Sequence, residues 1–267
     1  MKAKIGVLDS GVGGLSVLRE IHRLLPTHPT LYFADQAHVP YGPRNPDEIN
    51  EFVETITRFL LLQGARVIVV ACHAASTASL YDLRVRFPDV PFVGMEPAIK
   101  PAVETSKNGV IGVLTTQATA SGKLYRSVLE RFAGDVRVIT QVAPELVQIA
   151  ENGQQNTGPG REMIAHYVNP LLDAGADKIV MACTHFPFLA DEISTLAGAQ
   201  AMIVDPGAAI ARQVARMWPD DADIAPAENE YFTSGDPQQF RTLLRALLNV
   251  DTVVSGVEFS SMEHDDA

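Results

Sequence analysis

Three segments of the chain recur in the same order, roughly 110 residues further along. The pairs are Ile5–Ser10 with Ile111–Thr116, Val67–Cys72 with Lys178–Cys183, and Val93–Pro97 with Met202–Pro206. Buried strands resemble one another, so the shared Ala-Cys ending of the second pair is the most telling part of the repeat. The repeat predicts two similar half-molecules, each with one cysteine at the end of a strand.

Short β-branched runs alternate with longer segments of helical period, which predicts parallel α/β sheets. The expected strands are Ile5–Leu8, Thr30–Ala34, Arg66–Ala71, Pro91–Gly94, Val110–Leu114, Arg137–Thr140, Lys178–Met181, Met202–Val204 and segments near 229–233 and 251–254. The expected helices are 14–25, 47–62, 75–86, one with an apolar stripe from Leu124 to Phe132, 161–174, 207–217 and 237–248. The fold class is therefore α/β, with two pseudo-symmetric parallel-sheet domains and the active site in the cleft between them.

Crossover points between the domains are expected at Ala98–Pro101 and Asp205–Gly207. The first domain then comprises 1–97 with 208–267, and the second comprises 98–207. The polar, glycine-rich segment Asn152–Gly160 is expected to be a loop. Ser260–Ala267 is acidic and poor in apolar residues, which is typical of a frayed tail.

Composition excludes several classes of partner. There are 21 Lys and Arg against 32 Asp and Glu, a net charge of −11, with no basic block, so the chain is not expected to bind nucleic acid. The longest apolar run, Val67–Cys72, is far too short for a membrane span, and no signal peptide is recognisable. Two cysteines without a secretion signal indicate a reducing, cytoplasmic location.

Cys72 and Cys183 each follow a predicted strand and precede a predicted turn or helix. Backbone N–H groups and the helix dipole favour an anion at such a junction, so a thiol there can serve as a base. Three other interpretations stay open: two small buried hydrophobic side chains, a metal site built from Cys72-His73 and Cys183-x-His185, and a Cys–His hydrolase. The hydrolase interpretation leaves one cysteine without a purpose.

Asp9–Leu15 combines a carboxylate at a strand end with a glycine-rich turn into a helix. Backbone N–H groups in such a turn can hold a carboxylate or a phosphate. The segment is not a dinucleotide-binding fingerprint, because Ser16 occupies the position of its third glycine, and no P-loop lysine follows. Asp9 alone is equally consistent with a helix cap.

Two facing thiols suit one reaction that needs no cofactor: removal of a proton from one face of a carbon and return of another from the opposite face. Inverting a stereocentre requires an acid and a base on opposite sides, and the two exchange roles when the substrate has the other hand. By order along the chain, Asp9 is the candidate partner of Cys72, and His185 that of Cys183.

The chain resembles the glutamate racemase family within the aspartate/glutamate racemase superfamily. The resemblance rests on Asp9–Leu15, Phe33–Asp35, Pro40–Gly42, the Cys72 segment ending in Ala75-Ser76, Glu96-Pro97, Cys183–Pro187, Asp205–Gly207 and Thr233–Asp236. It implies a cofactor-independent isomerase with two α/β domains about a central cleft, a homodimer, that supplies D-glutamate for peptidoglycan. Glutamate would be the small-molecule substrate, and no metal is implied.

The resemblance also implies roles for individual residues. Cys72 and Cys183 would be the catalytic acid and base, supported by Asp9 and by His185 with Glu151. The substrate would be bound by side chains or main chain at Ser10, Pro40, Tyr41, Gly42, His73, Ala74, Thr119 and Thr184.

This chain departs from the family pattern directly after the first thiol. The family carries Asn-Thr, which contact the substrate's amino and carboxylate groups, whereas this chain has His73-Ala74. Ala74 has no hydroxyl to donate, and an unperturbed imidazole such as that of His73 titrates near neutrality. Two alternatives therefore stay open beside glutamate racemisation: racemisation or isomerisation of another acidic substrate such as aspartate, and a catalytically silent protein that binds an amino acid or a partner.

Overall fold

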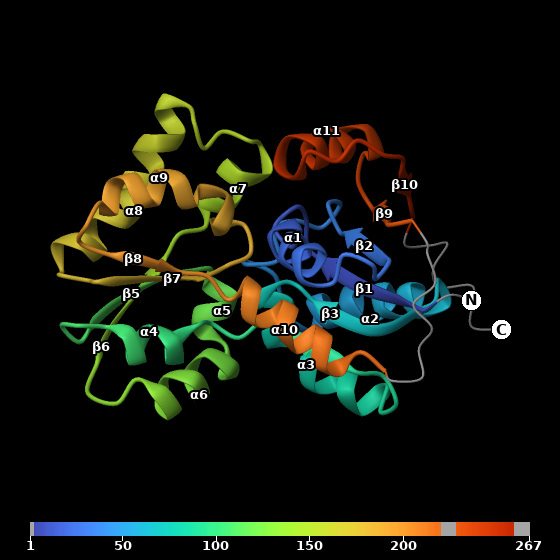
Figure 1. Cartoon of the computed structure of the whole chain (residues 1–267), viewed down its shortest axis with the longest axis horizontal. Coiled ribbons are helices and arrows are strands. Elements are labelled where there is room, and N and C mark those ends of the chain that lie inside the picture. The colour runs from blue at the N-terminus through green and yellow to red at the C-terminus, as the bar shows by residue number, and fades with distance from the viewer. Residues whose placement is uncertain (1–2, 220–227, 259–267) are drawn as a thin grey trace. The chain divides into compact units, whose positions relative to one another are not determined.

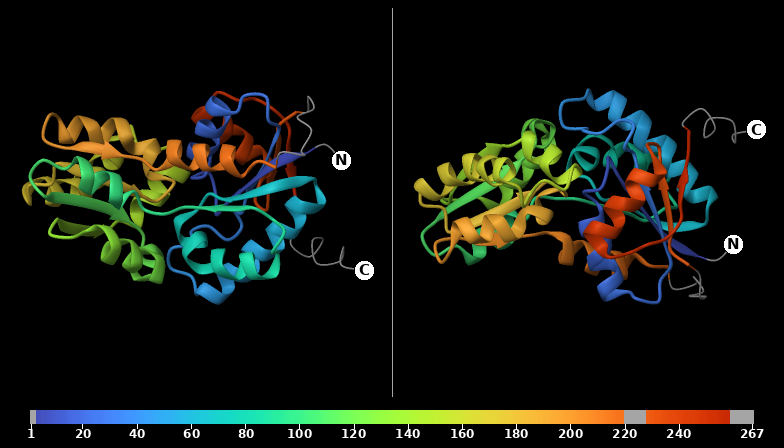
Figure 2. Two further views of the ribbon diagram at one scale, coloured as in Figure 1. Left: turned by 60° about the horizontal axis from the view of Figure 1, so that its bottom comes forward. Right: turned by 90° about the horizontal axis from the view of Figure 1, so that it is seen from above.

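The computed structural model describes residues 3–219 and 228–258 and divides into two compact units. Unit 1 comprises the described residues of Met1–Met95 and Gly207–Ala267, and unit 2 comprises Glu96–Pro206. Each unit holds one sheet with helices on both of its faces (Figures 1 and 2). The expected tail Ser260–Ala267 lies outside the described residues. No helix in the described part of the chain is both long and apolar enough to cross a membrane.

Unit 1 contains a six-stranded sheet in the order β10-β9-β2-β1-β3-β4, and every pair of neighbours is parallel. Its strands are β1 (Lys4–Asp9), β2 (Thr30–Ala34), β3 (Ala65–Val70), β4 (Phe92–Gly94), β9 (Glu230–Thr233) and β10 (Val254–Gly256). Its helices are α1 (Leu15–Leu24), α2 (Pro46–Leu62), α3 (His73–Arg86), α10 (Gly207–Met217) and α11 (Pro237–Leu248).

Unit 2 contains a four-stranded parallel sheet in the order β6-β5-β7-β8. Its strands are β5 (Val110–Thr115), β6 (Arg137–Val142), β7 (Lys178–Ala182) and β8 (Met202–Val204). Its helices are α4 (Ile99–Thr105), α5 (Gln117–Ser121), α6 (Lys123–Phe132), α7 (Glu145–Glu151), α8 (Gly158–Asp173), the 3₁₀ turn η1 (Phe186–Leu189) and α9 (Ala190–Ala197).

The strand orders confirm the repeat seen in the sequence. The order β6-β5-β7-β8 in unit 2 matches β2-β1-β3-β4 in unit 1, with each strand in the same place. The three repeated segments lie in corresponding strands, namely β1 and β5, β3 and β7, and β4 and β8. The α/β fold class with two parallel sheets is therefore confirmed.

Side chains alternate along a strand, so each strand presents residues to both faces of its sheet, and helices cover both faces. In β2, the ring of Tyr32 stacks on Phe240 of α11, while the next residue, Phe33, contacts Phe59 of α2. In unit 2, Leu114 packs in a cluster with residues of α7, α8 and α9, whereas Val113 packs with residues of α4 and α6. Every central strand is thus buried on both sides, which explains its continuous apolar sequence.

Several elements differ from the sequence-based expectation. The prediction of a loop over Asn152–Gly160 is wrong at its C-terminal end, because α8 begins at Gly158. The side chain of Thr157 caps this helix by accepting a hydrogen bond from Gly160 N, and a proline lies in the first turn. Helix α4 begins inside the expected crossover Ala98–Pro101. Strand β10 lies at Val254–Gly256 rather than near 251–254. Short helices α5, α7 and α9 were not expected, because segments of five to eight residues carry little periodic signal.

Gly6 and Gly112, which are equivalent in the repeat, allow neighbouring side chains to approach the first strand of each unit closely. A Cβ on Gly6 would lie 2.8 Å from Ile68 Cδ1 and 2.9 Å from Ala65 Cβ. A Cβ on Gly112 would lie 2.8 Å from Leu171 Cδ1. The repeat therefore preserves a packing requirement at this position, and the absence of a side chain is what satisfies it.

We expect Gly6→Ala to destabilise the chain by about 1–3 kcal/mol, because Ala65 Cβ is attached directly to the backbone and cannot rotate away. Gly158→Ala is the matched control, since no atom lies within 4 Å of its added Cβ and alanine suits a helix, so its effect should stay within about 0.5 kcal/mol. Urea unfolding of the three proteins measures both differences. Equal stability of Gly6→Ala and the wild type would contradict the close-packing argument.

Candidate active site

In unit 1, the pairing of two strands places candidate residues at one edge of the sheet. Strand β1 ends at Asp9, and its neighbour β3 ends at Val70, with Leu8 opposite Val70 and Ala71 N donating to Leu8 O at 2.8 Å. Because parallel strands end at the same edge, residues that follow β1 and β3 lie close together. We call Asp9, Ser10, Tyr41, Cys72 and His73 the Cys72 cluster.

Cys72 is the buried N-terminal cap residue of α3. Its sulfur lies 3.9 Å from the hydroxyl oxygen of Ser10. Asp9, also buried, accepts a hydrogen bond from Gly11 N at 2.9 Å. Asp9 therefore stabilises the glycine-rich turn and does not cap α1, whose cap position is Gly14, without a side-chain hydrogen bond. The Cys72 cluster brings a thiol, a hydroxyl and a carboxylate to the end of two neighbouring strands.

His73 opens α3, and its side chain is buried. Neither ring nitrogen has a hydrogen-bond partner among the described residues. Burial lowers the pKa of His73 to about 3, so the expectation that this imidazole titrates near neutrality is wrong. His73 is a neutral group with one donor and one acceptor to offer. The next residue, Ala74, is buried in the first turn of α3.

Pro40, Tyr41 and Gly42 lie in the loop between β2 and α2. The Tyr41 hydroxyl donates to Asp35 Oδ2 at 2.6 Å. Burial, the hydrogen bond to Asp35 and the negative charges of Asp35, Cys72 and Asp9 raise the pKa of Tyr41 well above its usual value. Tyr41 therefore stays protonated and belongs electrostatically to the Cys72 cluster. The main-chain N–H groups of Tyr41 and Gly42 have no acceptor within the described part of the chain.

Unit 2 holds a second group of candidates, at the corresponding edge of its own sheet. Strand β7 ends at Ala182, which lies opposite Thr115 of β5, and Cys183 follows directly. The Cys183 sulfur lies 3.7 Å from His185 Nδ1, and His185 Nε2 lies 2.5 Å from Glu151 Oε1 at the end of α7. All three side chains are buried. We call Cys183, His185 and Glu151 the Cys183 triad.

The Cys183 triad keeps its imidazole charged. Burial alone would lower the pKa of His185, but the hydrogen bonds with Cys183 and Glu151 and their negative charges outweigh burial and raise it well above the usual value. A protonated imidazole donates through both nitrogens, which fits one sulfur partner and one carboxylate partner. The triad therefore holds an exchangeable proton beside the Cys183 sulfur.

Two threonines among the candidates also lie in unit 2. Thr119 is buried in α5, and its hydroxyl lies 3.3 Å from that of Thr116. Thr184 is buried directly after Cys183. Both threonines therefore place hydroxyls at the ends of β5 and β7, the edge that also carries the Cys183 triad.

Comparison with known proteins gives a match over most of the chain. Residues 5–214 match the family described as Asp/Glu/Hydantoin racemase. The chain belongs to this racemase family. It is 46% identical over 248 residues to the glutamate racemase of Pseudomonas entomophila, covering 92% of this chain and 94% of that protein. It is 44% identical to the glutamate racemase of a Roseiflexus species, covering 91% of each.

A solved member of the racemase family has the same fold. The crystal structure of Escherichia coli glutamate racemase, in complex with L-glutamate and the activator UDP-MurNAc-Ala, aligns with a TM-score of 0.87 at 32% identity. The alignment covers 97% of this chain and 99% of that one. The structural comparison therefore agrees with the family match over nearly the full length of both chains.

Sequence reasoning missed one set of polar contacts near the Cys72 cluster. Asp35 is buried and accepts hydrogen bonds from Tyr41 and from Ser234, which follows β9. Both residues occur in strings that carried the family resemblance, Phe33–Asp35 and Thr233–Asp236. A polar residue directly after each of two neighbouring strands is the signal that could have linked them.

We expect Glu151→Gln to destabilise the fold most at or below pH 6.5. A raised native pKa of His185 contributes stability that is complete below the unfolded pKa of about 6.5 and is lost as pH rises through the native pKa. Loss of a charged, buried partner should cost about 1.5–3 kcal/mol at pH 5.5–6.5. Denaturant unfolding at several pH values measures this difference. A stability difference that grows as pH rises above 7 would contradict the charged His185–Glu151 pair.

Proposed function

We propose that this chain is a glutamate racemase that interconverts L- and D-glutamate by two-base proton transfer, with Cys72 and Cys183 as acid and base and no cofactor. The proposal rests chiefly on one observation. Each unit holds one buried cysteine at the same place in the repeat, after the third strand of the unit in chain order, beside polar groups of its own. Membership of the racemase family and the high identity to glutamate racemases support it.

In the proposed reaction, one cysteine acts as thiolate and the other as thiol. The thiolate takes the proton from Cα and becomes a thiol, and the electron pair of the broken C–H bond stays on the substrate as a carbanion. The second thiol then gives its proton to the opposite face of that carbon and becomes a thiolate. The product has the opposite configuration, the protonation of the two cysteines is reversed, and a substrate of the other hand restores it.

The two cysteines have different partners for these proton movements. His185, held by Glu151, keeps a proton beside Cys183. The Cys72 sulfur lies beside the Ser10 hydroxyl, and Cys72 belongs to the same cluster as the buried carboxylate of Asp9. We therefore assign His185 and Glu151 to proton exchange at Cys183, and Asp9 to the support of Cys72.

Glutamate carries one ammonium and two carboxylates, and the candidate binding groups match these charges. The Tyr41 and Gly42 amides and the hydroxyls of Ser10, Thr119 and Thr184 can donate to carboxylates. The neutral His73 can accept from the ammonium or donate to a carboxylate, in place of the family's asparagine. Pro40 and Ala74 complete the same two segments, and neither has a side chain that can donate a hydrogen bond.

The cellular role follows from the proposed reaction. A glutamate racemase supplies D-glutamate for peptidoglycan synthesis, and we place the chain in the cytoplasm as an enzyme of cell wall formation. We also propose a homodimer, as the family resemblance implies. Sedimentation of the purified protein over a range of concentrations tests the dimer independently of activity.

Cys72→Ser and Cys183→Ser should each lower racemisation of glutamate by at least a hundredfold, because a hydroxyl is a far weaker acid than a thiol and cannot serve as base at neutral pH. Proton NMR in D₂O follows loss of the Cα signal, and chiral chromatography follows the other enantiomer. Thermal melts of each variant show whether the fold is retained. Wild-type protein that neither exchanges nor inverts glutamate would overturn the proposed function.

His73→Leu should raise the KM for glutamate about tenfold to a hundredfold, because a hydrogen bond to a charged substrate group is lost. The amides of His73→Asn and His73→Gln approximate Nδ1 and Nε2 respectively, so the variant that restores the KM identifies the nitrogen involved. Initial rates in both directions give KM and kcat. An unchanged KM in His73→Leu would remove His73 from the binding site.

A panel of amino acids separates glutamate from the alternative that His73-Ala74 favours. Cα exchange with aspartate or another acidic amino acid, and little with glutamate, would retain the two-thiol chemistry and change the substrate. Binding of glutamate without exchange would instead indicate a silent binding protein.

A further inference from the structure

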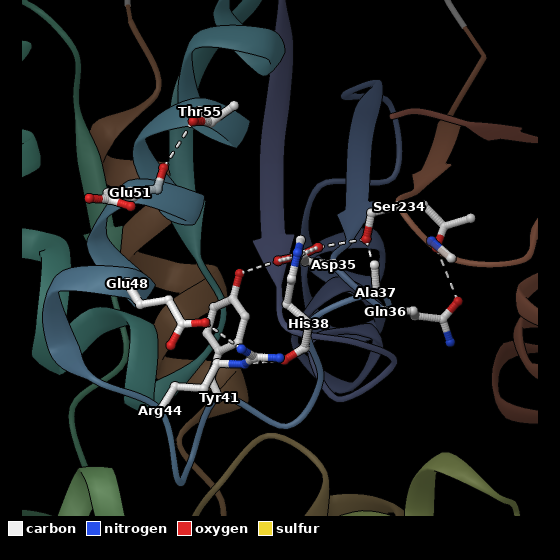
Figure 3. Close-up of polar contacts among 12 residues, drawn as sticks. Asp35, Gln36, Ala37, His38, Tyr41, Arg44, Glu48, Glu51, Thr55 and Ser234 are labelled. Atoms are coloured by element: carbon white, nitrogen blue, oxygen red, sulfur yellow. Dashed lines mark hydrogen bonds and ion pairs between the residues drawn. The ribbon is translucent and has the colours of Figure 1, made fainter. Parts of the chain in front are cut away.

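A buried carboxylate lies beside the Cys72 cluster and has no role in the proposed proton transfers. Asp35 follows β2 and is fully buried, with a relative exposure of 0%. Its oxygens accept from the Tyr41 hydroxyl at 2.6 Å, from Ser234 Oγ at 2.6 Å and from His38 Nδ1 at 2.8 Å. Figure 3 shows these three side chains converging on Asp35. We call Asp35, His38, Tyr41 and Ser234 the Asp35 network.

The Asp35 network connects the loop of residues 35–45 to three strands of unit 1. Asp35 N donates to Asp9 O at 2.9 Å, at the end of β1. Ser234, after β9, donates its own N–H to Ala34 O of β2 and accepts from Ala37 N at 3.0 Å. The Asp35 carboxylate thus lies at the edge of the sheet where these strands end. Tyr41 is the loop residue whose side chain contacts this carboxylate again.

A second set of contacts holds the outer side of the same loop. The ring of His38 stacks on Phe52 of α2 at 4.0 Å between centroids. Arg44 donates to His38 O at 2.6 Å and forms an ion pair with Glu48 of α2 at 2.5 Å (Figure 3). The loop is therefore fixed on one side by α2 and on the other by Asp35. The Tyr41 ring contacts Phe52 of α2 at 6.0 Å between centroids, whereas the Tyr41 hydroxyl is held by Asp35.

We propose that Asp35 is a positioning residue for substrate binding: its carboxylate holds Tyr41, and with it the free amides of Tyr41 and Gly42, in the geometry that binds a carboxylate of the substrate. This inference rests on the proposed function, because it assigns the two amides to an anionic substrate. Two adjacent N–H donors without an acceptor form an anion-binding site only if their directions are fixed. Asp35 is the carboxylate that accepts the hydrogen bond of the Tyr41 hydroxyl.

Asp35→Asn tests the proposal with little change of shape. An amide cannot accept from Tyr41, His38 and Ser234 together, because one of its two heavy atoms is itself a donor. We expect the KM for glutamate to rise about tenfold or more in both directions, with kcat changed less than about threefold. Hydrogen exchange of the amides in residues 36–45 should become faster, while that in β1 and β3 stays slow.

Asp177→Asn is the matched control in unit 2. Asp177 accepts from Ser106 Oγ at 2.8 Å, Lys107 N at 2.5 Å and Asn108 N at 3.2 Å, so the same substitution disturbs a similar carboxylate that holds a different loop. It should lower stability without raising the KM and without faster exchange in residues 36–45. Ser234→Ala removes a single donor and should raise the KM less than Asp35→Asn does.

Tyr41→Phe distinguishes positioning through Tyr41 from a general loss of order. If Asp35 acts through the Tyr41 hydroxyl, the KM of Asp35→Asn with Tyr41→Phe should exceed that of Asp35→Asn alone by no more than about twofold. Fully multiplicative effects would overturn the proposal. An unchanged KM in Asp35→Asn, or a fall in kcat and thermal stability in parallel at constant KM, would also overturn it.

The proposed function and this inference can fail separately. If the wild-type protein does not exchange the Cα proton of glutamate, the proposed function is overturned. Amide hydrogen exchange of residues 36–45 in Asp35→Asn and Asp177→Asn still decides whether Asp35 holds the loop. If the wild-type protein is active but the amides of this loop still exchange slowly in Asp35→Asn, only the inference about Asp35 is overturned.

Discussion

The parallel pairing of β1 with β3, and of β5 with β7, is the constraint on which both candidate clusters depend. Parallel strands end at the same edge of a sheet, so residues that follow each strand are brought together although tens of residues separate them. In unit 1 this places Asp9 and Ser10 beside Cys72. In unit 2 it places the Thr115 segment beside Cys183. Each cysteine then meets the polar groups with which it can exchange protons.

The two units repeat the fold but differ in the chemistry around the thiol. His185 lies two residues after Cys183 and is charged, because Glu151 and the sulfur stabilise its proton. His73 lies directly after Cys72 and is neutral, because burial without a partner disfavours the charged form. The same residue type thus serves different purposes, and the surroundings of the imidazole rather than its sequence position decide which.

Much of the fold could be predicted from the sequence. The central strands were predicted correctly, since strands buried on both faces have a continuous apolar sequence, and the repeat indicated two equivalent sheets. Short helices such as α7 could not be predicted, because seven residues hold too few turns for a periodic pattern. Thr157 and Pro159 start α8 inside a segment whose glycine content suggested a loop, so local capping outweighed composition.

For the candidate site, the sequence by itself determined which residues end the strands: Asp9, the two cysteines and the histidines that follow them. The sequence of strands and helices along the chain, and the chemistry of each side chain, follow from residue type and spacing. Only the tertiary structure decided which of these groups meet, that Glu151 reaches His185, that Asp35 holds Tyr41, and that His73 is neutral. Hydrogen-bond partners and burial depend on segments that are distant in the chain, and both set protonation, so no local pattern could reveal them.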